Sequence, residues 1–289
     1  MSTTRRSGSF AIVLALLLSG PASAAETEPC PADPGVEESQ EAPASPASPG
    51  LVKIALEDGK YILGAPLRWK GKQWLAFASV AAGVVAFGFA LDLPGRDETQ
   101  SHQTAALDDL TRIVEPFGQE YSWAVIGAYG IAGFVFRDPE ARDIAIDSAL
   151  ATILASGVIT PILKQVIGRA RPNEDQGSTS FHPFSGDQAF PSGHTTQAFA
   201  VASVISAHSD KVWVSICAYT LAGLVGFSRI YHEAHWSSDV AAGAVIGTAV
   251  GRGLVAFNRR LRAKHENLYV AFTPILNDDR RGLEMLVRF

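Results

Sequence analysis

The stretch "WLAFASVAAGVVAFGFAL", residues 74–91, has no charged side chain over eighteen residues. A membrane-spanning helix needs about 20 mainly apolar residues, and glycine within apolar runs is common in such helices. This segment extends to residue 92, and five further apolar segments follow at residues 121–136, 144–167, 193–208, 211–228 and 237–257. The sequence therefore predicts an all-α fold, a six-helix membrane-type bundle, although several segments fall short of a full span.

The last apolar segment and the tail after it have patterns of their own. Gly243, Gly247 and Gly251 recur every four residues, which places them on one helical face where two backbones can approach closely. The same spacing would also serve a tightly packed soluble bundle. The tail reads "LYVAFTPIL", "NDDRRG" and "LEMLVRF" from residue 268 onward, which predicts a small C-terminal β-hairpin.

Composition changes divide the chain into segments. Residues 1–24, with Arg5 and Arg6 before a short apolar run and a small-residue cleavage pattern, are typical of a signal peptide. A first transmembrane helix is the alternative, but the run is about half the length of a span. Residues 25–50 are rich in Pro, Glu, Ser and Ala and predict a disordered linker. Residues 51–72 form an amphipathic basic segment, 73–258 the helical bundle, and 259–289 a basic turn with the hairpin.

Charge and cysteine content exclude several classes of protein. The net charge is −5 and no long Lys/Arg tract is present, which argues against a nucleic-acid partner. Two cysteines, Cys30 and Cys217, do not suffice for a disulfide framework or a cysteine-based metal site.

Polar residues gather in three stretches beside the apolar segments. In "KQVIGRARP", Lys164 and Arg171 are seven residues apart, about two helical turns, so both cations can share a face. In "AFPSGHTTQAF", residues 189–199, Ser192 and Gly193 open a helix whose free amides form an anion site within reach of His194.

The third stretch is "SRIYHEAHWSSD", residues 228–239. The four-residue spacing of His235 and Asp239 predicts that the carboxylate accepts the imidazole Nδ1–H and fixes its tautomer. Arg229 adds a third cation to Lys164 and Arg171. Three cations, a helix amino terminus and two histidines are the groups needed to bind and transfer a phosphoryl group. No acidic cluster suited to magnesium accompanies them, so we expect metal-independent chemistry without a cofactor.

These stretches resemble the signatures of one family. Residues 164–172 match K-x6-R-P, residues 191–194 match P-S-G-H, and residues 228–239 match S-R-x5-H-x3-D. The sequence is similar in these motifs to the type 2 phosphatidic acid phosphatase and vanadium haloperoxidase superfamily. The resemblance covers roughly residues 74–257.

The resemblance implies a role for each matching residue. His235 would attack phosphorus to form a phosphohistidine, supported by Asp239, and His194 would protonate the leaving alcohol and then activate water. The phosphoryl oxygens would be held by the remaining matches, which are Lys164, Arg171, Ser192, Gly193 and Arg229. Three other histidines, His182, His208 and His232, match no signature position and are expected to be surface or loop residues.

Within the superfamily, the glycine-rich final helix and the six apolar segments favour the membrane lipid phosphatases. The expected partners are a membrane and a phosphorylated lipid, namely phosphatidate, a polyprenyl pyrophosphate or a lipid A type of molecule. A soluble periplasmic acid phosphatase and a non-catalytic membrane scaffold are the alternatives, and a haloperoxidase is disfavoured.

Basic residues lie on both sides of the bundle, at Lys60, Arg68, Lys70 and Lys72 before it and at Arg259, Arg260, Arg262 and Lys264 after it. By the positive-inside tendency, both sets are cytoplasmic, and the three motifs then face the periplasm from an inner membrane. A signal peptide cleaved after Ala24 would instead leave the following residues outside the cytoplasm, and with six spans the three motifs would then face the cytoplasm. Either the signal is not cleaved in the standard way, or one segment does not cross, or the bundle is soluble in the periplasm.

Overall fold

All six apolar segments are helical in the computed structural model, which describes residues 51–267, 269–277 and 280–288. The chain is mostly helical, as the sequence predicts. The helices of these segments are α4 (Gly71–Ser101), α6 (Glu120–Phe134), α7 (Pro139–Thr152), which continues through the π-helical turn η2 (Ile153–Ile159) into α8 (Thr160–Ile167), α9 (Gly193–His208), α10 (Val212–Tyr231) and α11 (Ser237–Asn267). The predicted signal peptide and linker lie outside the described residues.

Shorter helices raise the number above the predicted six. The segment before residue 72 forms α2 (Leu51–Leu63) and α3 (Ala65–Arg68), and α5 (Ala105–Val114) lies between α4 and α6. Single 3-10 turns follow at η1 (Glu115–Gly118) and η3 (Pro172–Glu174). A search for apolar runs misses α5, because two aspartates, a threonine and an arginine interrupt its sequence AALDDLTRIV. Its start depends on the Thr104 hydroxyl, which accepts a hydrogen bond from the Leu107 amide.

Among the described residues, four stretches rather than six are long and apolar enough to cross a membrane. They are Gly71–Ser101, Pro139–Ile167, Val212–Tyr231 and Ser237–Arg262. Large apolar side chains on α4, such as Leu75, Phe77 and Phe89, are exposed, as suits a helix surrounded by lipid. These features identify a membrane protein.

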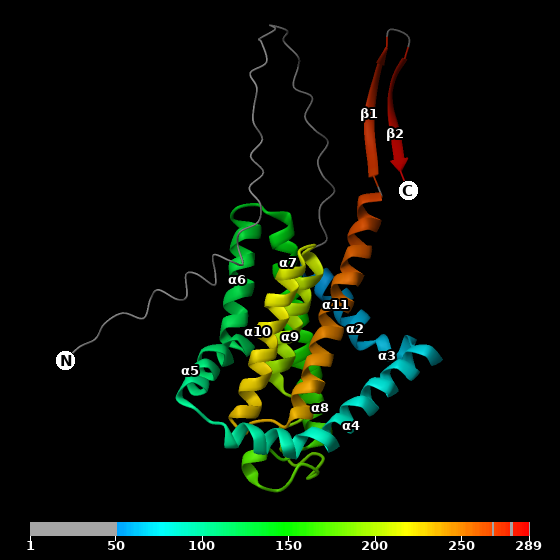
Figure 1. Ribbon diagram of the computed structural model, residues 1–289. Coiled ribbons are helices and arrows are strands. Elements are labelled where there is room, and N and C mark those ends of the chain that lie inside the picture. The colour runs from blue at the N-terminus through cyan, green and yellow to red at the C-terminus, as the bar shows by residue number, and fades with distance from the viewer. Residues whose placement is uncertain (1–50, 268, 278–279, 289) are drawn as a thin grey trace, which may run out of the picture. The chain divides into compact units, whose positions relative to one another are not determined.

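Helix α9 is apolar for a different reason. Every residue from Thr195 to Ser206 is buried except Phe199, and contacts with α7, α10 and α11 surround the helix. Figure 1 shows α6, α7, α9, α10 and α11 running side by side, with α9 among its neighbours. Protein rather than lipid therefore covers the sixteen residues of α9, which run through the middle of the bundle.

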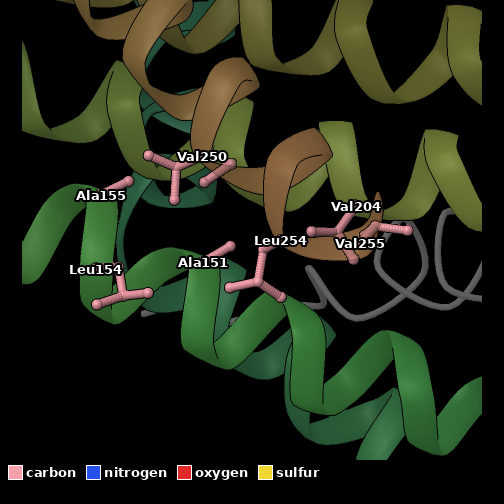
Figure 2. Packing of buried hydrophobic residues seen from close by; sticks show 8 residues of the cluster. Ala151, Leu154, Ala155, Val204, Val250, Leu254 and Val255 are labelled. Carbon is pink, nitrogen blue, oxygen red and sulfur yellow. The ribbon is translucent and has the colours of Figure 1, made fainter. Parts of the chain in front are cut away.

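The glycine face of α11 packs on α9, as the spacing of four predicts. A Cβ atom on Gly243 would lie 2.7 Å from the carbonyl oxygen of Ser192, and one on Gly247 would lie 2.8 Å from the Ala200 amide nitrogen. Beside this contact, Figure 2 shows a cluster of small and branched apolar side chains from α7, η2, α9 and α11, namely Ala151, Leu154, Ala155, Val204, Val250, Leu254 and Val255. The close approach fixes the start of α11 against the start of α9.

Two strands follow α11. Strand β1 (Tyr269–Asn277) pairs antiparallel with β2 (Arg280–Arg288). The register runs from Tyr269 opposite Arg288 to Asn277 opposite Arg280.

We expect Gly247→Val to destabilise the bundle, because its Cβ would collide with the backbone of Thr196 and Ala200. Overpacking of this kind costs about 1–3 kcal/mol in the free energy of unfolding. The thermal unfolding midpoint in detergent should fall, whereas the control Gly127→Val on α6, where an added Cβ has no neighbour within 4 Å, should change it little. Equal midpoints for the two variants would contradict the close packing of α9 and α11.

Candidate functional site

The three polar stretches meet at one end of the helices. Lys164 lies in the last turn of α8, Arg171 directly precedes η3, His194 lies in the first turn of α9, Arg229 lies in the last turn of α10, and Asp239 lies in the first turn of α11 with His235 just before it. Figure 1 shows the end of α8 and the lower ends of α10 and α11 at the same level. Because consecutive helices run in opposite directions, motifs far apart in the sequence share this end.

The imidazole of His235 is buried and held by the backbone. Its Nδ1 lies 2.6 Å from the carbonyl oxygen of Ala189, and its exposed fraction is 4%. A carbonyl oxygen only accepts hydrogen bonds, so Nδ1 carries the proton in this contact. Nε2 therefore has a free lone pair.

Asp239 has a different partner from the predicted one. Its Oδ2 lies 3.8 Å from Nδ1 of His235, too far for a hydrogen bond. The carboxylate instead accepts hydrogen bonds from Nη1 of Arg169 at 2.6 Å and from the Trp236 amide at 2.8 Å. The spacing of four brings the two side chains together, but the guanidinium and the amide before α11 engage the carboxylate more closely.

Burial lowers the pKa of His235 below its ordinary value of 6.5, because desolvation disfavours the charged imidazolium. Asp239 opposes this shift, and the positive charges of Lys164 and Arg229 add to it. The imidazole is therefore neutral at neutral pH, as a nucleophile requires.

Lys164 and Arg229 act electrostatically on this imidazole, and Arg171 interacts with both of these cations. Coulombic interactions link Lys164 with Arg171 and Arg229. The Lys164 amine donates to the carbonyl of Gln188, the residue before Ala189. One guanidinium nitrogen of Arg229, Nη1, pairs with Glu115, whereas its Nε is buried without a hydrogen-bond partner among the described residues. A phosphoryl oxygen would satisfy such a donor.

The start of α9 differs from a simple serine cap. The Ser192 side chain makes no capping bond to α9, and its Oγ accepts from Oγ1 of Thr195 at 2.9 Å. The Ser192 amide donates to the carbonyl of Asp239 at 3.0 Å, which joins the starts of α9 and α11. Ser192 thus fixes the loop, and the helix amino terminus with Gly193 remains the feature suited to an anion.

His194 is half-buried beside these groups. An added Cβ on Gly118 of η1 would come within 2.7 Å of the His194 Cβ, so η1 packs directly on it. Burial, followed by the charge of Arg229, lowers the pKa of His194 to about 4. A bound phosphate dianion would act in the opposite direction, because an adjacent negative charge favours the imidazolium.

A cavity of about 460 Å³ opens beside His194. The remaining lining comes from α5, η1, the start of α6 and the end of α10, namely Asp108, Arg112, Glu115, Pro116, Gln119, Glu120 and His232. Its size suits a small ligand or a lipid headgroup. The cavity leaves room for a leaving group next to the proposed acid.

The three histidines named above that match no signature position each have a carboxylate partner. His182 pairs with Asp187 at 2.8 Å, and His208 pairs with Asp147 at 2.9 Å. His208 ends α9 with a side chain only 7% exposed, so the expected surface or loop position is wrong for this residue. His232 lies closer to the site than the sequence suggested, because its Nδ1 lies 2.8 Å from Oε2 of Glu115.

Sequence reasoning missed three charged residues of the site, namely Arg169, Asp92 and Glu115. Arg169 lies within the K-x6-R-P stretch, two residues before Arg171, so its position in a motif was the available signal. A carboxylate at the end of the most apolar segment was the signal for Asp92. Nothing in its local sequence distinguishes Glu115.

Comparison with known proteins places this geometry in context. Residues 147–263 match the family described as the PAP2 superfamily. A lipid A 1-phosphatase of Rhizobium johnstonii is 42% identical over 63% of this chain and 78% of that protein, and one of Rhizobium etli is 31% identical over 63% of this chain and 82% of that protein. An undecaprenyl-diphosphatase of Sulfolobus acidocaldarius is 30% identical over 51% of this chain and 68% of that protein.

Proposed function

The chain belongs to the PAP2 superfamily, and on that basis we propose that it is a metal-independent lipid phosphatase. It is a phosphoric ester hydrolase that cleaves a lipid phosphomonoester or pyrophosphate through a phosphohistidine on His235. The observation that carries this proposal is the hydrogen bond from Nδ1 of His235 to the Ala189 carbonyl. This bond leaves the Nε2 lone pair for attack on phosphorus.

In the first step, Nε2 of His235 forms a bond to phosphorus while the bond from phosphorus to the leaving oxygen breaks. His194 gives a proton to that oxygen, so a monoester releases an alcohol and a pyrophosphate releases a lipid monophosphate. The cavity beside His194 would receive this leaving group. Asp239 stabilises the positive charge that develops on the imidazole, from 3.8 Å.

In the second step, His194 takes a proton from water, and the water oxygen attacks phosphorus. The bond between nitrogen and phosphorus breaks, which returns neutral His235 and releases inorganic phosphate. Lys164, Arg171 and Arg229 neutralise the phosphoryl oxygens in both steps, assisted by the Gly193 amide and the Ser192 loop. Fixed cations of this kind stabilise the charge of a transferring phosphoryl group without a metal ion.

The substrate class follows from the membrane setting and from the relatives. Relatives named lipid A 1-phosphatase and undecaprenyl-diphosphatase support a phosphorylated lipid of the lipid A, polyprenyl pyrophosphate or phosphatidate type. A site at the helix ends allows the phosphate to enter while acyl chains stay in the bilayer.

The site is proposed to face the periplasm from an inner membrane. The opposite end of α11 carries Arg259, Arg260 and Arg262, which favour the cytoplasmic side. The helix start with Asp239 then lies on the external side. The soluble alternative is disfavoured by the four candidate spans.

We expect His235→Ala to abolish phosphate release, because the substitution removes Nε2, the nitrogen proposed to attack phosphorus. The measurement is inorganic phosphate released from a lipid A, a polyprenyl pyrophosphate and a phosphatidate substrate, together with mass spectrometry of acid-quenched protein for the phosphohistidine. The control His182→Ala, a partly exposed histidine paired with Asp187, should keep the wild-type rate. A His235→Ala variant near the wild-type rate would exclude His235 as the nucleophile. A wild-type protein inactive on all three lipids would favour a non-catalytic scaffold.

We expect an acidic optimum for kcat/KM, which reports the free enzyme and free substrate. Burial lowers the pKa of His235 from 6.5, so the imidazole becomes protonated, and kcat/KM falls, only at a pH below 6.5. His194, with a pKa of about 4, is neutral near pH 6 in the free enzyme. The proton that it gives to the leaving group therefore arrives on the phosphate monoanion and passes to His194 in the complex. The monoanion declines above pH about 6, the second pKa of a phosphate monoester. Activity should therefore fall as the pH rises further.

A leaving group that needs no proton provides the control for this profile. His194→Gln should retain more of its rate with p-nitrophenyl phosphate than with an alkyl phosphate, because nitrophenolate leaves without protonation. An acid limb at or above pH 6.5 in the wild-type protein would contradict a neutral, buried His235.

A further inference from the structure

We propose that Arg169 and Asp92 are positioning residues that hold Asp239, and through it His235, in the geometry for attack. The inference rests on the proposed function and assigns a role to two residues that the motif does not explain. Arg169 donates from Nη1 to Oδ1 of Asp239 at 2.6 Å and from Nη2 to Oδ2 of Asp92 at 2.6 Å. One guanidinium therefore joins a carboxylate of α4 to a carboxylate of α11.

The three side chains are removed from solvent. The exposed fractions of the side chains are 4% for Arg169, 3% for Asp92 and 0% for Asp239. A buried charge is costly unless it is paired and hydrogen-bonded, so each of these groups depends on the others. The ring of Trp236 also lies 5.5 Å from the guanidinium carbon, which restricts its movement further.

Asp92 also caps α11 from another helix. Its Oδ1 accepts from the Ser238 amide at 2.8 Å, and its Oδ2 accepts from the Ser238 hydroxyl at 2.8 Å. A carboxylate at a helix amino terminus satisfies a free amide and interacts favourably with the helix dipole. The start of α11, which carries Asp239, is thus fixed by a residue of α4.

Helix α4 is built for this contact. Asp92 is its only buried residue within the described part of the chain. Gly88 and Gly95 lie four residues before and three residues after it, on the same face, and an added Cβ would come within 3.0 Å of Ser238 at Gly88 and 2.7 Å of Ser237 at Gly95. Small residues on both sides let the aspartate reach the start of α11.

Arg169 supports both groups that lie beside Nδ1 of His235, the Asp239 carboxylate and the Ala189 carbonyl. Its side chain holds Asp239, and its carbonyl oxygen accepts from the Ala189 amide at 3.0 Å. The Ala189 carbonyl in turn accepts from Nδ1 of His235. A change in the Arg169 side chain therefore affects the carboxylate directly while the backbone support stays in place.

The test compares Asp92→Asn with a matched change on the same helix. Asparagine keeps an acceptor for the Ser238 amide but loses the charge that pairs with Arg169. Arg96 also ties α4 to the loops, through Glu233 at 2.5 Å and Asp175 at 2.7 Å, without touching Asp239. Arg96→Gln, which leaves Asp92, Arg169 and Asp239 in place, is therefore the control for loss of helix docking.

We expect Asp92→Asn to lower kcat about 10²-fold with KM unchanged, because a small misplacement of the attacking group affects the transition state rather than substrate binding. Arg96→Gln should lower the unfolding midpoint by a similar amount but keep kcat near wild type. Arg169→Lys, which keeps the charge, should retain more kcat than Arg169→Gln. Nitrogen NMR of labelled histidine should show the His235 ring signals moved by Asp92→Asn and unmoved by Arg96→Gln.

Two results would overturn the positioning role. One is an Asp92→Asn variant with wild-type kcat and unmoved His235 signals. The other is that Asp92→Asn and Arg96→Gln lower kcat and the unfolding midpoint in parallel while the His235 signals stay unmoved. Asp92 would then only dock α4 on the bundle. A wild-type protein that releases no phosphate from any lipid overturns the proposed function instead, and the NMR comparison still decides the positioning role.

Discussion

The buried guanidinium of Arg169 between Asp92 and Asp239 is the interaction on which the site depends. Each of these three buried charges is costly unless it is paired. The pairing therefore fixes α4, the loop after α8 and the start of α11 relative to one another. Because the Trp236 amide and the Ser238 amide bind these same carboxylates, the arrangement also begins α11 at a defined residue. The position of His235 follows from that beginning.

The close contact of α9 and α11 gives the site its second constraint. Glycines on α11 bring the backbones together, and the Ser192 amide bonds to the Asp239 carbonyl where the two helices start. The start of α9, proposed to bind the anion, and His235, the proposed nucleophile before α11, are therefore held at a fixed distance. A cluster of small apolar side chains farther along the helices stabilises the same contact (Figure 2).

The sequence predicted the helical fold and the three motifs that the structure brings to one end, because apolar runs and motif spacing are local properties. It did not distinguish lipid from protein as the surroundings of α9, since both environments select the same apolar residues. It also assigned Nδ1 of His235 to Asp239, whereas the Ala189 carbonyl holds it. That partner is a backbone atom from a distant loop, and no side-chain pattern encodes it. The sequence did not predict Arg169 and Asp92 as site residues for a related reason, because their pairing joins residues far apart in the sequence.

The ends of the helices reconcile a charged site with an apolar bundle. Charged groups in the middle of a bilayer are expensive, but a helix end offers free amides or carbonyls and access to the interface. Lys164 and Arg229 lie in the last turns of α8 and α10, where cations are favoured, and Asp239 lies in a first turn, where a carboxylate is favoured. The alternating helix directions therefore place each charge at the terminus that stabilises it. The same geometry brings these charges around one imidazole.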